Sequence, residues 1–151
     1  MVEYIEAKIR KLDWNNSSEI QERAIDDLTQ IDEKDVILLI QPMEKKYWEN
    51  AALTLKRIGY PRNILAIPGM LNWLMDLNWP GARIALNVLG TIERKTLLPY
   101  LESAVEKAIY ERDDMWIEAL KELAFKSLSI RLDEFENKEL FIEFEKYVYT
   151  L

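Results

Sequence analysis

The stretches WENAALTLKRIG, residues 48–59, and WPGARIALNVLG, residues 79–90, contain nearly the same twelve-residue pattern. Both fit W-x-x-A-x-x-x-L-x-x-[IL]-G. Counted from the alanine, the leucine and the next apolar residue fall at i+4 and i+7, which is one face of an α-helix. These positions are Ala51, Leu55 and Ile58 in the first stretch and Ala82, Leu86 and Leu89 in the second. The repeated pattern therefore predicts two amphipathic helices of the same kind.

Two further copies of the pattern are less complete. RAIDDLTQI repeats the spacing from Ala24 without the tryptophan, and WIEALKELAFKS repeats it from Ala119 without the final apolar residue and glycine. The four alanines lie 27, 31 and 37 residues apart. A recurrence at this spacing is typical of helical repeat proteins.

Glycine and proline recur with the pattern. Gly59 and Gly90 each follow their alanine by eight residues, where a glycine ends a helix in the left-handed conformation. Pro68 and Pro99 follow these glycines by nine residues, which fits the first turn of a second helix. Each unit is therefore predicted to be a helix, a short turn and a second helix.

The segment KRIGYPRNILAIPGMLNWLMDLNWPGARIALNVLG, residues 56–90, resembles the HEAT family, especially its short bacterial form. In that form a helix ending in [RK]-I-G precedes a D-P-R-like turn and an A-[IV]-P-x-L helix; here Tyr60 replaces the aspartate. The resemblance covers about residues 20–125. The segment 73–82 also resembles small bacterial helical proteins with a WLxDxNWPxA segment. The HEAT resemblance implies an α-α superhelix that binds other macromolecules.

Both ends of the chain carry an amphipathic segment that would cover the last exposed flank of such a stack. The apolar positions are Ile5, Ile9 and Leu12 near the start and Leu140, Phe144, Val148 and Leu151 near the end. We therefore expect one all-α domain over residues 1–151, an α-α superhelix of about four helical pairs with N- and C-terminal capping helices.

The composition restricts the chemistry. The 151-residue chain has no cysteine and no histidine, which removes thiolate chemistry, histidine bases and the commonest metal ligands. Acidic pairs such as Asp26-Asp27 lack the spacing of a calcium loop. We expect no catalysis, no cofactor and no metal. The chain shows neither a secretory pattern nor an apolar run that could span a bilayer, so we expect a cytoplasmic protein that does not bind membranes.

The net charge of −7 is unevenly distributed. Residues 1–44 carry −6, residues 45–95 carry +5, and residues 96–151 carry −6. An acidic chain is not typical of a nucleic-acid binder. The basic middle third nevertheless leaves open the hypothesis of a local basic surface patch.

The tryptophans divide into two groups. Trp48, Trp79 and Trp116 each precede their anchor alanine by three residues, which favours a packing role at the start of the helix. Trp73 and Trp14 break this phase, and we expect them to be exposed. In the loops near them, Asn78 is expected to cap a helix that starts at Pro80, and residues 13–18 to cap the helix that includes Glu19.

Two sets of residues are candidates for binding. The predicted concave face of the second helices consists of Met70, Trp73, Asp76, Tyr100, Ser103, Lys107 and Tyr110. A possible basic edge formed by the turns consists of Lys34, Arg62, Arg94 and Lys95. The alternative for the second set is that these cations lie in solvated turns. They would then form local ion pairs with Asp35 or Glu93, which contribute little to stability.

The preferred hypothesis is a non-catalytic protein-interaction module, with an immunity or antitoxin-like protein that binds a basic partner as one form of it. The alternative is a HEAT-like DNA-binding protein or DNA glycosylase that uses the basic central repeats. A third hypothesis is homodimerisation through the aromatic residues near the C-terminus, Phe135, Phe141, Tyr147 and Tyr149. The sequence names neither the partner nor the oligomeric state.

Overall fold

The computed structural model describes residues 1–148, and this part of the chain is helical with no strand. The α-helices are α1 (Val2–Arg10), α2 (Ser18–Leu28), α3 (Trp48–Ile58), α4 (Ile67–Trp73), α5 (Ala82–Leu89), α6 (Arg94–Glu111), α7 (Asp114–Lys121) and α8 (Lys138–Lys146). The 3-10 segments are η1 (Glu33–Leu39), η2 (Lys45–Tyr47), η3 (Ile64–Ala66) and η5 (Leu132–Glu134), and the π-helical η4 (Glu122–Ser127) continues α7. The predicted all-α class is confirmed.

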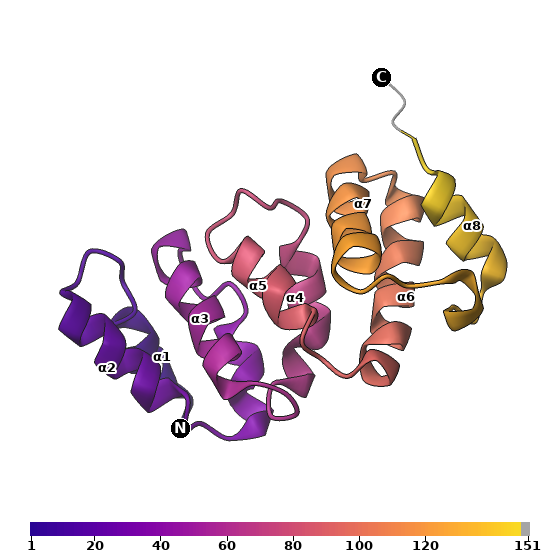
Figure 1. Ribbon diagram of the computed structural model, residues 1–151. Coiled ribbons are helices and arrows are strands. Elements are labelled where there is room, and N and C mark those ends of the chain that lie inside the picture. The colour runs from indigo at the N-terminus through magenta and orange to yellow at the C-terminus, as the bar shows by residue number, and fades with distance from the viewer. Residues whose placement is uncertain (149–151) are drawn as a thin grey trace.

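The helices follow one another in a row, with α1 and α8 at opposite ends of it (Figure 1). The helices that carry the repeated pattern pack side by side, α2 on α3 and α3 on α5. The elements that follow them also pack on one another, η1 on η3, α4 on α6 and α6 on α8. Contacts of α3 with η1, α4 with α5 and α6 with α7 join the two sets.

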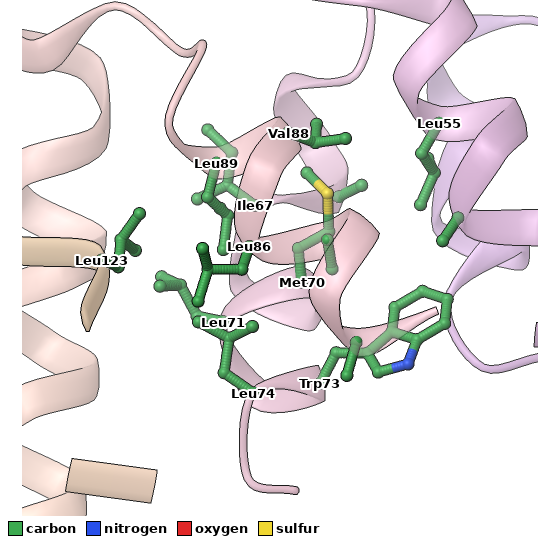
Figure 2. Close-up of a cluster of buried hydrophobic side chains, with 14 of the residues drawn as sticks. Leu55, Ile67, Met70, Leu71, Trp73, Leu74, Leu86, Val88, Leu89 and Leu123 are labelled. Atoms are coloured by element: carbon green, nitrogen blue, oxygen red, sulfur yellow. The ribbon is translucent and has the colours of Figure 1, made fainter. Parts of the chain in front are cut away.

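The repeated pattern marks the core. The anchor alanines Ala24, Ala51, Ala82 and Ala119 are all at most 1% exposed. Figure 2 shows Leu55 of α3, Leu86 of α5 and Leu123 of η4 in one buried cluster with apolar side chains of α4. Small anchors let the helices approach closely, and the larger residues at i+4 and i+7 fill the space between them.

The prediction that Met70 and Trp73 form an exposed binding face is wrong, because both side chains are fully buried. They lie on the side of α4 that faces the core (Figure 2). Loop 79–81 gives the Trp73 ring its polar partner, since the indole Nε1 donates to the carbonyl of Pro80 at 3.0 Å. The ring also packs edge-on against Trp48, with centroids 6.4 Å apart.

The other tryptophans follow the prediction. Trp116 is fully buried, and Trp48 and Trp79 are half-buried, pack against the core and meet edge-to-face at 6.0 Å. Trp14 is 50% exposed. A tryptophan that starts a helix of the repeat thus packs between neighbouring helices, which is the usual use of a large ring with one polar atom.

The predicted end of the first helix is correct in both pairs, and the predicted start of the second helix is correct only in the first pair. Gly59 follows the last residue of α3 with a φ of +71°, and Gly90 follows that of α5, although with a right-handed φ of −68°. Pro68 lies in the first turn of α4, whereas α6 starts at Arg94, so Pro99 lies inside the helix. The buried Leu97 extends the apolar face of α6 upstream of the proline, which accounts for the early start.

The two predicted capping loops also differ. In loop 13–18, the hydroxyl of Ser17 accepts from the amide of Ile20 and caps α2, as expected. In loop 76–81, Asn78 does not cap a helix at Pro80. Helix α5 begins at Ala82 with Gly81 at its N-cap, and the Gly81 amide donates to a carboxylate oxygen of Glu49. This loop is therefore tied to α3 rather than closed on itself.

The predicted caps are partly confirmed. Ile5, Ile9 and Leu12 are buried near the start, and Leu140 and Phe144 are buried near the end. Helix α8 ends at Lys146, however, so Val148 is 78% exposed and does not continue the stripe. Leu151 lies outside the described residues.

The predicted aromatic dimer face is wrong for the residues that the structure describes. Phe135 and Phe141 are at most 3% exposed and pack with Phe125 and Phe144 inside the C-terminal end of the row. Tyr147 is half-buried, and its hydroxyl donates to Asp114 at 2.7 Å. Tyr149 lies outside the described residues. These rings therefore stabilise the fold by packing against one another at α8.

A membrane-spanning segment would require a long apolar helix. No helix within residues 1–148 has the length and hydropathy for this.

An acidic groove between α6 and α8

Four residues of the predicted binding face are exposed on α6. Tyr100, Ser103 and Lys107 line a small hollow of about 110 Å³ between α4 and α6, and Tyr110 is 88% exposed near the end of the same helix. The hollow is also lined by Pro68 and Asn72 of α4 and by Trp116, whose indole Nε1 donates to the carbonyl of Leu71 at 2.9 Å. Asp76 is half-buried in the loop after α4, where its carboxylate accepts from the Asn78 amide.

A larger depression adjoins this hollow on α6, with Ser103 in the lining of both. Two hollows of about 560 and 510 Å³ run between α6 and the segment that contains η5 and α8. Glu106 lines both hollows, so they adjoin at this residue. We call the two hollows together the acidic groove. Its lining residues are Lys95, Leu98, Pro99, Glu102, Ser103, Glu106, Glu134, Glu136, Asn137, Glu139, Leu140, Ile142 and Glu143.

Two glutamates of the acidic groove hold its walls together. The Glu102 carboxylate accepts from the backbone amides of Glu136 and Asn137, at 2.9 and 3.0 Å, which fixes the start of α8 against α6. Glu134 accepts from Arg94 at 2.9 Å and closes η5 onto the first turn of α6. These bonds position the walls without any contribution from a ligand.

The other four glutamates of the groove, Glu106, Glu136, Glu139 and Glu143, are exposed and form no ion pair within residues 1–148. Between them lie apolar lining residues, of which Ile142 is 41% exposed. Clustered carboxylates raise the local concentration of cations, and exposed apolar side chains gain free energy when they are covered. The groove is therefore suited to a ligand that is both cationic and apolar.

Sequence reasoning missed most of this groove. The spacing of Leu98, Glu102 and Glu106 places them on one face of α6, and Glu139 and Glu143 share a face of α8. These signals were visible. The sequence does not show that α6 and α8 lie side by side, because that contact depends on the turn through η5.

The predicted basic edge is largely engaged within the molecule. Arg62 donates to the carbonyls of Thr29 and Ile31, both at 3.0 Å, and holds the end of α2. Arg94 donates to the carbonyl of Leu128 and to Glu134. The alternative of local partners thus fits both arginines, although those partners are not Asp35 or Glu93. Lys34 is exposed, and Lys95 lines the acidic groove.

The basic middle third pairs with the two acidic thirds. Arg57 of α3 contacts Glu22 and Asp26 of α2 at 2.9 and 3.2 Å, and the hydrogen bonds from its guanidinium lower the pKa of the Glu22 carboxyl. Arg83 of α5 contacts Glu122 of η4 at 3.1 Å. The alternation of charge along the sequence therefore joins neighbouring helices, which leaves fewer free cations for nucleic acid.

A further hollow of about 470 Å³ lies at the N-terminal end, lined by Tyr4, Ile5, Asp27 and Arg62 among others. Asp32, Glu33 and Asp35 line it as well, so this hollow is also acidic; Asp27 contacts Lys8 at 2.7 Å, and Arg62 lies in the wall. No group of three Asp or Glu side chains in the described part of the chain is placed to hold a metal ion.

The chain was compared with known proteins. The family model described as a domain of unknown function, DUF5071, matches residues 41–149. Neither the curated proteins nor the solved structures contain a significant match. The matched segment includes every helix from α3 to α8 and thus both walls of the acidic groove. The chain belongs to the DUF5071 family.

Proposed function

We propose that this protein is a non-catalytic protein-interaction module of the HEAT-like repeat type, and that its acidic groove binds a basic segment of another protein. The observation that carries the proposal is the set of four glutamates that line the groove and have no cationic partner among residues 1–148. An immunity or antitoxin-like protein that covers a basic toxin is one function of this kind.

The arrangement of the helices supports the repeat architecture. Consecutive helices with the same pattern bury the same alanine, and the elements that follow them pack on one another in the same order. A stack of this type exposes an extended surface, which such proteins use for binding.

The charge of the groove supports a basic partner. Six glutamates and one lysine line it, and two of these glutamates are occupied by internal hydrogen bonds. Complementary charge at an interface accelerates association and excludes partners of the wrong sign. The exposed apolar lining would contribute affinity once covered.

A capture experiment with charge-matched variants tests the proposal. The tagged protein, the groove variant Glu106→Lys/Glu143→Lys and the control variant Glu19→Lys/Glu118→Lys are each incubated with a lysate of the source cells at low salt. All four glutamates are exposed, and both variants change the net charge equally. Helix α2 carries Glu19, and α7 carries Glu118, so neither control position lines the groove.

We expect the unmodified protein and the control variant to retain the same basic proteins, identified by mass spectrometry, and the groove variant to lose them. Equal retention by the groove variant would contradict the assignment of the groove. A captured set without basic proteins would contradict the proposed partner.

A further inference from the structure

We infer that the occupant of the acidic groove is a basic, amphipathic α-helix. This inference rests on the proposed function and specifies the conformation of the bound segment. It follows from what the groove walls offer: apolar and acidic side chains, and few free backbone groups beyond the first turns of α6 and α8.

The walls do not provide partners for an extended chain. Beyond their first turns, helices α6 and α8 satisfy their own backbone amides and carbonyls, and the amides of Glu136 and Asn137 are occupied by Glu102. Pro99 has no N–H and leaves the carbonyl of Lys95 without its usual donor. A single free acceptor does not provide the series of main-chain hydrogen bonds that an extended peptide needs. An extended segment, which binds through its main chain, would lose hydrogen bonds to water here.

A polyproline segment is also disfavoured. Such segments dock in grooves lined by aromatic rings. None of the side chains that line the two hollows is aromatic, and Tyr100 lies in the separate hollow between α4 and α6. A helix, in contrast, satisfies its own backbone and presents only side chains to its partner.

The order of the lining residues describes the helix that would fit. The accessible apolar side chains of the groove are Pro99 and the half-buried Leu98 on α6 and Ile142 on α8, and the free carboxylates of Glu106, Glu139 and Glu143 lie on the same two helices. The complementary helix has an apolar stripe with lysine or arginine on both of its sides. Lys95 and Glu106 mark the ends of the α6 wall, which is about 16 Å long at 1.5 Å per residue, so about three turns of the ligand fit.

A binding experiment with defined peptides tests the inference. The first is a fluorescein-labelled peptide of leucine and lysine with leucines at helical spacing. The second has the same composition in scrambled order, and the third has proline at its centre. Anisotropy titrations use the unmodified protein, Glu106→Lys/Glu143→Lys and the control Glu19→Lys/Glu118→Lys. Circular dichroism of each mixture reports whether the peptide becomes helical.

We expect the amphipathic peptide to bind the unmodified and control proteins as a helix, with an affinity that falls as salt rises. Binding to the groove variant is expected to be at least about tenfold weaker, since like charges would face the peptide. The central proline is expected to weaken binding about 100-fold, because it breaks the helix.

The outcomes separate the two proposals. If all three peptides bind equally and the groove variant loses them all, the groove accepts basic segments, and only the inference of a helix is wrong. If the groove variant binds every peptide as well as the unmodified protein does, the groove is not the binding site and both proposals fail. Absence of binding to the unmodified protein at low salt has the same consequence.

Discussion

Replacing Gly81 with alanine probes the contact between loop 79–81 and α3. A Cβ atom at this position would lie 2.7 Å from the carbonyl oxygen of Trp48, 2.7 Å from the ring of Trp73 and 3.0 Å from Ala52. Two of these neighbours are a backbone oxygen and a fully buried indole, which cannot move away easily. The φ of Gly81 is +82°, a conformation that an L-residue rarely adopts.

The expected cost has two parts. The left-handed backbone costs about 1–2 kcal/mol for alanine, and overpacking of a filled site adds about 1–3 kcal/mol. The free energy of unfolding should therefore fall by about 2–5 kcal/mol, which is a large part of the stability of a domain of this size.

Two other glycines serve as matched controls. Gly59 has a φ of +71° and a ψ of 167°, a conformation essentially confined to glycine, but a Cβ atom there would have its nearest contact at 3.8 Å, so Gly59→Ala should show only a conformational cost of about 1–3 kcal/mol. Gly90 has an ordinary φ of −68° and a nearest contact of 3.4 Å, so Gly90→Ala should be close to neutral.

Urea unfolding followed by far-ultraviolet circular dichroism measures all three variants, and an unchanged slope confirms that the two-state comparison is valid. The predicted order of stability is Gly90→Ala, then Gly59→Ala, then Gly81→Ala. If Gly81→Ala lost only the roughly 1–2 kcal/mol of its left-handed backbone, the added Cβ atom would meet no filled site, and the Trp73 ring would not lie beneath this loop.

Three further predictions concern acid stability, the core and nucleic acid. The hydrogen bond from Lys8 lowers the pKa of the Asp27 carboxyl. The stability that this pair contributes is therefore present above the ordinary pKa of a carboxyl and is lost as the pH falls through the lowered pKa. The urea midpoint of Asp27→Asn should consequently fall less on acidification than that of the unmodified protein. Trp116→Phe should lower the free energy of unfolding in urea by about 2 kcal/mol, because it leaves a cavity and removes the indole hydrogen bond to the carbonyl of Leu71. An unchanged urea midpoint would place Trp116 outside the core. Labelled duplex DNA should show no salt-dependent anisotropy change at low salt, and saturable binding would favour the nucleic-acid alternative.

The repeated twelve-residue pattern was enough to predict the helical class and the buried anchors. Ala51 and Ala82, together with the apolar residues at i+4 and i+7, are buried in the structure. Helical periodicity is a local property, since side chains three and four residues apart share a face whatever the rest of the chain does. The unequal charge of the three thirds was equally visible, and it also indicated a basic partner.

The surfaces that remain free could not be predicted in the same way. Met70 and Trp73 have the spacing of an outward face, but the contact of α4 with α5 and the loop that ends at Gly81 bury them. Conversely, Glu106 and Glu143 are distant in sequence, and packing of α6 beside α8 makes them line one groove. Local spacing specifies which face of a helix is apolar, whereas non-local packing specifies which neighbour covers each face, and a binding groove forms only where two helices meet and nothing else covers them.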